Sequence, residues 1–198
     1  MTGLDQAGLW ADGDLEIPDI PDIPPPAGPR LTERDMLDLL HHRYSQRSYN
    51  GGSEAPRYIC AEEVRSGAGF GARRTADFIA VETWESSLRN GLTVHGVEVK
   101  TSRSDWLREL KDPDKAAVSM GYASHCWLAA ADVSVARHGE LPPGWGLLLP
   151  QERAGVRVLI ARVKASRREV AHLSPSQTAA LLRAVAKTAT ARAGAGRG

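Results

Sequence analysis

The stretch 75–84 (TADFIAVETW) limits the possible folds more than any other part of the chain, because it is apolar on both sides of a strand. Phe78, Ile79 and Val81 are strand-forming residues at both odd and even positions, so their side chains point to opposite faces. A strand with two apolar faces belongs inside a sheet that is covered on both sides. We therefore expect an α/β protein, with helices packed on the faces of a sheet.

The rest of the sequence predicts the other elements of this fold. Strand-like segments are expected at 57–65, 92–100, 125–131, 145–149 and 156–163. Helices are expected from Thr32 to about Arg47, after a Ser102 or Ser104 cap as far as Pro113, from Asp114 to about Tyr122, and after Ser174. Three strands, then helices, then more strands and a last helix predict a mixed sheet.

Charge and proline divide the chain of 198 residues into a tail and a body. Residues 1–29 hold five Asp, one Glu and no Lys or Arg, whereas the whole chain carries +1, so the remainder carries +7. The tail repeats an Ile-Pro-Asp unit, which excludes regular helix and sheet. We predict a disordered acidic tail (1–29), one domain (30–190) and a flexible basic end (191–198). The tail is either a spacer or a partner-binding peptide.

The predicted location is the cytoplasm, with no membrane partner. No run of eighteen apolar residues is present, and the chain does not start with basic residues followed by an apolar stretch. The basic body is consistent with a polyanionic partner such as DNA, or with an ordinary solvated surface.

A constellation of ionisable residues lies within the predicted strands. Asp77 stands inside one apolar strand, and Glu98-Val99-Lys100 ends the next after a gap of twenty residues. Side chains alternate along a strand, so Glu98 and Lys100 share a face, and Asp77 lies beside them if the two strands pair. Two carboxylates in a poorly hydrated place repel each other unless a cation compensates.

This set of groups suits phosphodiester hydrolysis. Magnesium favours one or two carboxylates together with water and phosphate oxygens, and the Val99 carbonyl can add a ligand. A metal acidifies its bound water, and Lys100 can position that water, deprotonate it or offset developing negative charge. The structural alternative is a buried ion pair with no catalytic role.

The segments 73–80 (RRTADFIA) and 97–106 (VEVKTSRSDW) resemble the PD-(D/E)xK nuclease superfamily, and are most similar to the MmcB-like DNA repair proteins. The resemblance implies a restriction-endonuclease-like core, a DNA substrate and Mg²⁺, with Mn²⁺ as a possible substitute. It assigns Asp77 and Glu98 as metal ligands and Lys100 as the catalytic lysine. Ala76 stands where the name-giving proline of the superfamily would be.

The resemblance also points to further site residues. Glu33 matches an acid on the first helix, although the helix dipole alone would favour a Glu there. Glu63 matches an acid on the first strand, and Glu62 would then point the other way. Basic residues expected near DNA are Arg73, Arg74, Arg103, Lys111 and Lys115, each of which can equally be a solvated surface charge.

The leading interpretation is a metal-dependent endonuclease in DNA repair, recombination, or phage or bacterial DNA metabolism. One alternative is a non-catalytic nucleic-acid-binding module with the same fold. Another is an interaction protein that uses its Pro-rich tail. A homodimer would supply the two sites that cutting both strands requires.

Overall fold

The structure is a computed structural model of the chain, and it describes residues 30–45, 56–67, 75–84, 91–111, 120–137, 139–170 and 172–195. The predicted acidic tail and most of the helix predicted from Asp114 lie outside these residues. Among the helices described, none has both the length and the apolar character needed to cross a membrane.

The described chain folds as an α/β structure with a six-stranded sheet. The strands are β1 (Tyr58–Arg65), β2 (Thr75–Glu82), β3 (Val94–Lys100), β4 (His125–Ala130), β5 (Gly146–Arg153) and β6 (Val156–Val163). The helices are α1 (Glu33–Arg43), α3 (Arg103–Leu110) and α5 (Pro175–Ala195). The prediction of a mixed α/β sheet is confirmed, with most strand ends within a few residues.

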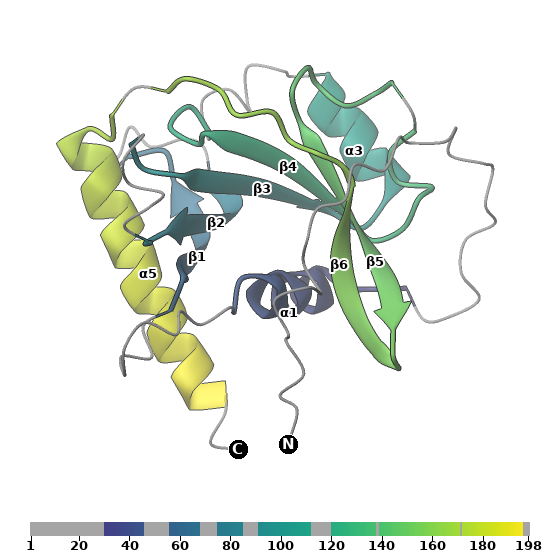
Figure 1. Cartoon of the computed structure of the whole chain (residues 1–198), viewed down its shortest axis with the longest axis horizontal. Coiled ribbons are helices and arrows are strands. Elements are labelled where there is room, and N and C mark those ends of the chain that lie inside the picture. The colour runs from purple at the N-terminus through teal and green to yellow at the C-terminus, as the bar shows by residue number, and fades with distance from the viewer. Residues whose placement is uncertain are drawn as a thin grey trace, which may run out of the picture.

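The strands lie side by side in the order in which they occur in the chain, from β1 to β6 (Figure 1). β1, β2 and β3 form an antiparallel meander. β3–β4 and β4–β5 are parallel pairs, and β5–β6 is an antiparallel hairpin. Each parallel pair needs a crossover connection, and α3 lies on the crossover between β3 and β4.

Helix α1 covers one face of the sheet. Its Thr32 cap and Asp35 form the reciprocal bonds of a capping box, which satisfies the free N–H groups of the first turn. Met36, Leu40 and Tyr44 recur at helical spacing and are buried against Phe78 and other residues of the central strands.

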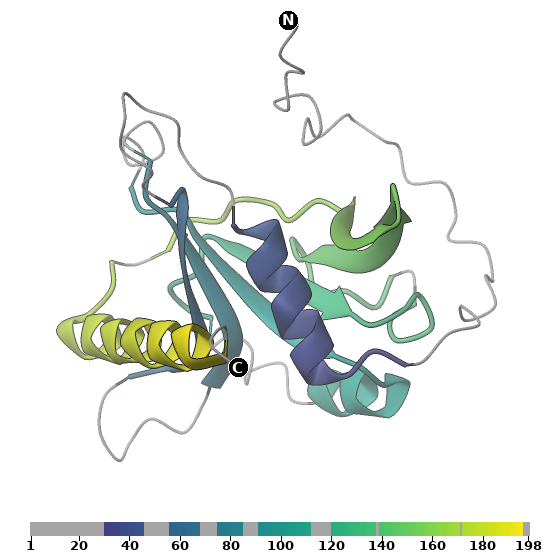
Figure 2. The same ribbon diagram turned by 90° about the horizontal axis from the view of Figure 1, so that it is seen from below.

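The opposite face is covered by α5 and α3. Leu181 and Ala184 of α5 pack against Ala61 and Ile79, and Trp106 of α3 packs against Leu128 in a separate cluster. The two helices lie at opposite ends of the molecule in both ribbon views (Figures 1 and 2). Lys100 ends β3 two residues before Ser102, the N-cap of α3, so α3 follows directly from that end of the strand.

Strand β5 runs four residues beyond Leu149, where the sequence predicts its end. The strand continues through Pro150 to Arg153 and turns at Ala154 and Gly155, which both have positive φ. The pairs between β4 and β5 stop at Leu148, so Pro150 lies where β5 has only β6 as a partner. A proline is tolerated there because one side of the strand has no ladder at this position.

The first and last helices also end at other residues than predicted. α1 ends at Arg43, and Tyr44 is its C-cap, whereas the helix was predicted to reach about Arg47. α5 begins with the predicted Ser174–Gln177 capping box but runs to Ala195, so residues 191–195 are helical rather than frayed. Alanine, the strongest helix former, is frequent in this segment and extends the helix past the predicted domain end.

Candidate active site

The candidate site begins where β2 and β3 separate. Their ladder ends at the pair Phe78–Val97, so Asp77 and Glu98 are the first residues beyond it. The Asp77 Oδ2 accepts a hydrogen bond of 2.8 Å from the Val99 N–H, in place of the missing bond from β2. In a strand the N–H and C=O of one residue face the same neighbour, so the Val99 carbonyl also faces this gap.

Glu98 and Lys100 share the face that α3 and α5 cover, as their alternation along β3 predicts. The Lys100 Nζ lies 3.2 Å from Glu98 Oε2 and 3.8 Å from Asp77 Oδ2. The structure thus brings the three predicted residues together. Their catalytic role remains a prediction.

A third carboxylate, Glu109, was missed in the sequence. Its Oε2 lies 3.4 Å from the Lys100 Nζ, and the residue is only 7% exposed. Ser102 caps α3, accepting a bond from the Asp105 N–H, and so fixes the phase of the helix. Glu109 comes three residues after the buried Trp106, so it falls on the apolar stripe. A carboxylate in that stripe is the signal that could have identified it.

We call Asp77, Glu98, Lys100 and Glu109 the Lys100 cluster, and its formal charge is negative. Three carboxylates against one ammonium leave −2 when all are ionised. Glu98 is 3% exposed, and burial together with the charge of Asp77 raises its pKa to about 8. Burial acts to lower the pKa of Lys100, but the surrounding carboxylates outweigh it and raise that pKa.

An open groove of about 560 Å³ adjoins this cluster. Asp77 forms part of its lining, together with side chains of α1, β1 and α5. Both weaker candidate ligands, Glu33 and Glu63, line the same groove, but among the described residues the ion-pair partners of Lys100 are Asp77, Glu98 and Glu109 instead. Glu63 instead accepts a hydrogen bond of 2.5 Å from the Lys187 Nζ of α5.

Glu63 is also unusual in its backbone, because its φ of 52° is left-handed inside β1. A non-glycine residue in this region costs about 1–3 kcal/mol. Glu63 faces Asp77 in the register, yet the pair is missing from an otherwise continuous ladder. The hairpin therefore departs from regular pairing beside the groove.

The oxygen ligands of the Lys100 cluster are of the kind that a divalent cation prefers, but few of them converge on one point. Among the described residues, no three His, Cys, Asp or Glu side chains converge as a metal site. Asp77 and Glu98 do supply the two carboxylates that magnesium commonly takes, and the Val99 carbonyl faces the same gap. A cation of charge +2 would also cancel the formal charge of the cluster.

The predicted DNA-binding residues lie in different surroundings, and some of them are outside the described part of the chain. Arg103 is engaged in the structure, because its guanidinium pairs with both carboxylate oxygens of Glu140 and also donates to the Val135 carbonyl. Lys111 is exposed at the C-cap of α3. Arg73, Arg74 and Lys115 lie outside the described residues.

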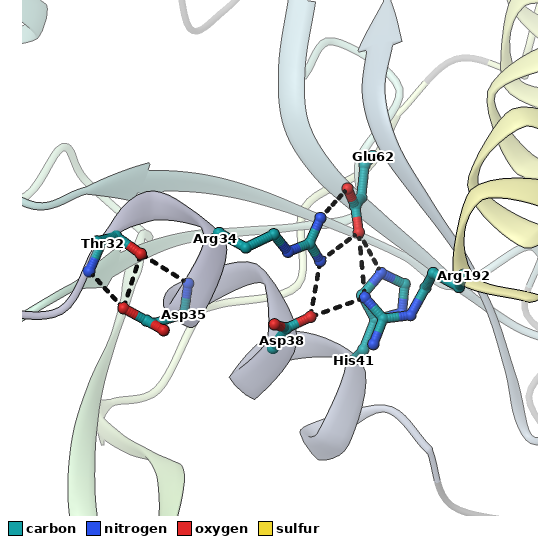
Figure 3. Close-up of polar contacts among 7 residues, drawn as sticks. All are labelled: Thr32, Arg34, Asp35, Asp38, His41, Glu62 and Arg192. Carbon is teal, nitrogen blue, oxygen red and sulfur yellow. Dashed lines mark hydrogen bonds and ion pairs between the residues drawn. The ribbon is translucent and has the colours of Figure 1, made fainter. Parts of the chain in front are cut away.

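A second group of charges lies on the other side of β1, and we call it the Glu62 cluster (Figure 3). Glu62 points away from the groove, as predicted, and accepts bonds of 2.9 Å from Arg34 and pairs at 2.7 Å with His41. Arg192 of α5 lies 2.9 Å from Asp38 and 3.5 Å from Glu62. These contacts tie α1, β1 and α5 together.

The charges of the Glu62 cluster balance. Arg34 and Arg192 face Asp38 and Glu62, and burial lowers the pKa of His41, which favours its neutral form. Burial acts to raise the pKa of Glu62, but Arg34 and His41 outweigh it and lower that pKa.

Comparisons with protein-family models, with curated proteins and with solved structures yield no match. The functional assignment therefore depends on the residues and geometry of the chain itself.

Proposed function

We propose that this chain is a metal-dependent deoxyribonuclease that hydrolyses phosphodiester bonds. The observation in its favour is the Lys100 cluster, in which a lysine with a side chain only 12% exposed is surrounded by three carboxylates beside an open groove. A surplus of buried acid is unfavourable unless an added cation compensates it. The second cluster, around Glu62, has no such surplus.

Asp77 and Glu98 are the residues that would hold Mg²⁺ or Mn²⁺, with the Val99 carbonyl as a further ligand. When bound, such a cation polarises a phosphoryl group and acidifies a coordinated water. The bond from the Val99 N–H keeps the Asp77 carboxylate at the gap between β2 and β3. Two ligands on neighbouring strands of one sheet form a rigid base for phosphate binding.

Lys100 supplies positive charge at the reacting phosphate. The acidic side chains around its ammonium raise the pKa of Lys100, so it stays protonated and can offset the negative charge that develops during hydrolysis. Glu109 acts through Lys100 as a positioning residue, because it holds the Nζ from the α3 side.

The finer assignment follows the sequence resemblance. We infer a restriction-endonuclease-like fold of the PD-(D/E)xK type, most similar to MmcB-like proteins, and a role in DNA repair or related DNA metabolism. The mixed sheet with helices on both faces is compatible with this fold but also with others.

A second candidate function is a non-catalytic nucleic-acid-binding module. The observation in its favour is that Lys100 already lies among the carboxylates, and that no three ligating side chains converge in the described part of the chain. In such a protein the Lys100 cluster would be a structural ion network.

Cleavage of a panel of labelled DNAs distinguishes the two functions. Wild type and Lys100→Met are incubated with single-stranded, duplex, nicked and branched DNA, with magnesium, manganese or chelator. We expect metal-dependent cleavage that falls about 10³-fold in Lys100→Met, since methionine keeps an unbranched side chain of similar length but removes the charge. The matched control is Arg153→Met, an exposed cation on the β5–β6 hairpin. DNA binding without cleavage by any of these proteins would support the binding module instead.

A further inference from the structure

The groove beside Asp77 has a cationic wall that the sequence analysis did not identify. Arg183 and Lys187 lie one turn apart on α5, and Arg65 comes from the end of β1. All three are exposed, and all three line the groove. Within the described part of the chain, Arg65 and Arg183 make no ion pair.

Helix α5 is suited to this role by its composition. Between Pro175 and Ala195 it carries Arg183, Lys187 and Arg192 and no Asp or Glu. The small, buried residues Ala180 and Ala184 also line the groove, and Arg183 and Lys187 are the long side chains that α5 places there. Arg192 belongs instead to the Glu62 cluster.

The ion pair between Lys187 and Glu63 does not close the groove. Both side chains remain largely exposed, at 70% and 67%. An exposed pair of this kind contributes only about 0–1 kcal/mol, so a phosphate can displace the carboxylate from Lys187. Glu63 therefore competes with an anionic ligand without excluding it.

We propose that this groove binds the phosphates of a single DNA strand and leads the strand to Asp77. The inference rests on the proposed nuclease function, and it adds the substrate class and the residues that hold the substrate. A volume of about 560 Å³ is in the range of a small-molecule pocket, so the groove can hold a short stretch of one strand. The substrate that we infer is therefore a single strand of DNA, including one freed at an opened DNA end, and duplex DNA is the alternative that the binding experiment tests.

Fluorescence anisotropy in the presence of chelator measures DNA binding by the groove alone, because the proposed cleavage needs a metal ion. The probes are a labelled oligothymidylate and a labelled duplex of the same length, titrated with the full chain at several salt concentrations. For the double variant Arg183→Ala/Lys187→Ala we expect about tenfold weaker binding of the single strand. The slope of log K against log salt should fall by about 1.4, since each phosphate contact on a single strand contributes about 0.7.

Two further variants exclude a merely structural effect. Glu63→Gln removes the competing carboxylate and should bind the single strand about two- to threefold more tightly, which a folding defect would not produce. Arg153→Ala, an exposed arginine on the distant β5–β6 hairpin, should bind like wild type.

The outcomes separate this inference from the nuclease function. Unchanged binding by the double variant, a preference of wild type for duplex, or no binding to either probe would overturn the groove as a single-strand site. If the double variant cleaves DNA normally with unchanged binding, the nuclease function stands and the groove assignment is wrong. If groove-dependent binding occurs but no metal supports cleavage, the groove assignment stands and the nuclease function fails.

Discussion

The Lys100 and Glu62 clusters use the same kinds of residues, but their charges add up differently. The Glu62 cluster sets two arginines against two carboxylates and joins two helices to the edge strand β1. The Lys100 cluster sets one lysine against three carboxylates in a more buried place. A balanced cluster is complete by itself and holds the fold together. A cluster with surplus acid remains open to an added cation, so it is the candidate for chemistry.

The largest expected difference between the clusters is in cleavage. Asp77→Asn should reduce the rate about 10³-fold, because the amide loses the charge that holds a metal but can still accept the bond from the Val99 N–H. Glu62→Gln should leave the rate within about threefold, and steady-state cleavage assays measure both variants. Similar losses in the two variants would mean that the clusters do not differ in function.

The next effect is on stability, where replacing a Glu by Gln should stabilise the protein in the Lys100 cluster and destabilise it in the Glu62 cluster. Folded Glu98 keeps its proton up to about pH 8, whereas the unfolded side chain releases it near 4.5. The folded state thus binds more protons in this window, so the free energy of unfolding falls as pH rises from 4.5 to about 8. Glu98→Gln should remove this loss and stabilise the metal-free protein at pH 8 by an amount on the order of 2 kcal/mol.

Urea denaturation in chelator at pH 5 and pH 8 checks the Glu98 effect. The free energy of unfolding of Glu98→Gln should differ little from that of wild type at pH 5 and should be clearly higher at pH 8. A variant that is less stable than wild type at pH 8 would show that Glu98 is a favourable charge, as in an ordinary ion pair.

The smallest effect belongs to the balanced cluster. Glu62→Gln should destabilise the protein at pH 7 by about 1 kcal/mol, because it weakens the charge-assisted bonds of Arg34 and His41. Since the pKa of Glu62 is lowered, the stability it provides in wild type is present above pH 4.5 and is lost as the pH falls. Urea titrations at pH 3.5 and pH 7 measure the change, and equal stabilities of variant and wild type at pH 7 would contradict it.

The sequence predicts the strands and the proximity of Asp77, Glu98 and Lys100, since alternation along β3 and pairing with β2 are local rules. Glu109 could also have been found from the sequence. It lies three residues after the apolar Trp106, and this spacing places both side chains on the same face of the predicted helix. The pairing of Arg103 with Glu140 and of Lys187 with Glu63 joins residues 37 and 124 positions apart. Such contacts depend on how the helices pack, and no local pattern encodes them.

The separation of β1 and α5 in the chain also affects the order in which the molecule assembles. Neighbouring strands follow one another in the chain, so their pairing closes short loops, whereas the bond from the Glu62 N–H to Thr188 on α5 spans 126 residues. Long loops cost more entropy to close, so α5 is expected to dock late in folding and to detach early in partial unfolding. In hydrogen exchange, the amides of α5 should therefore exchange before those of β3.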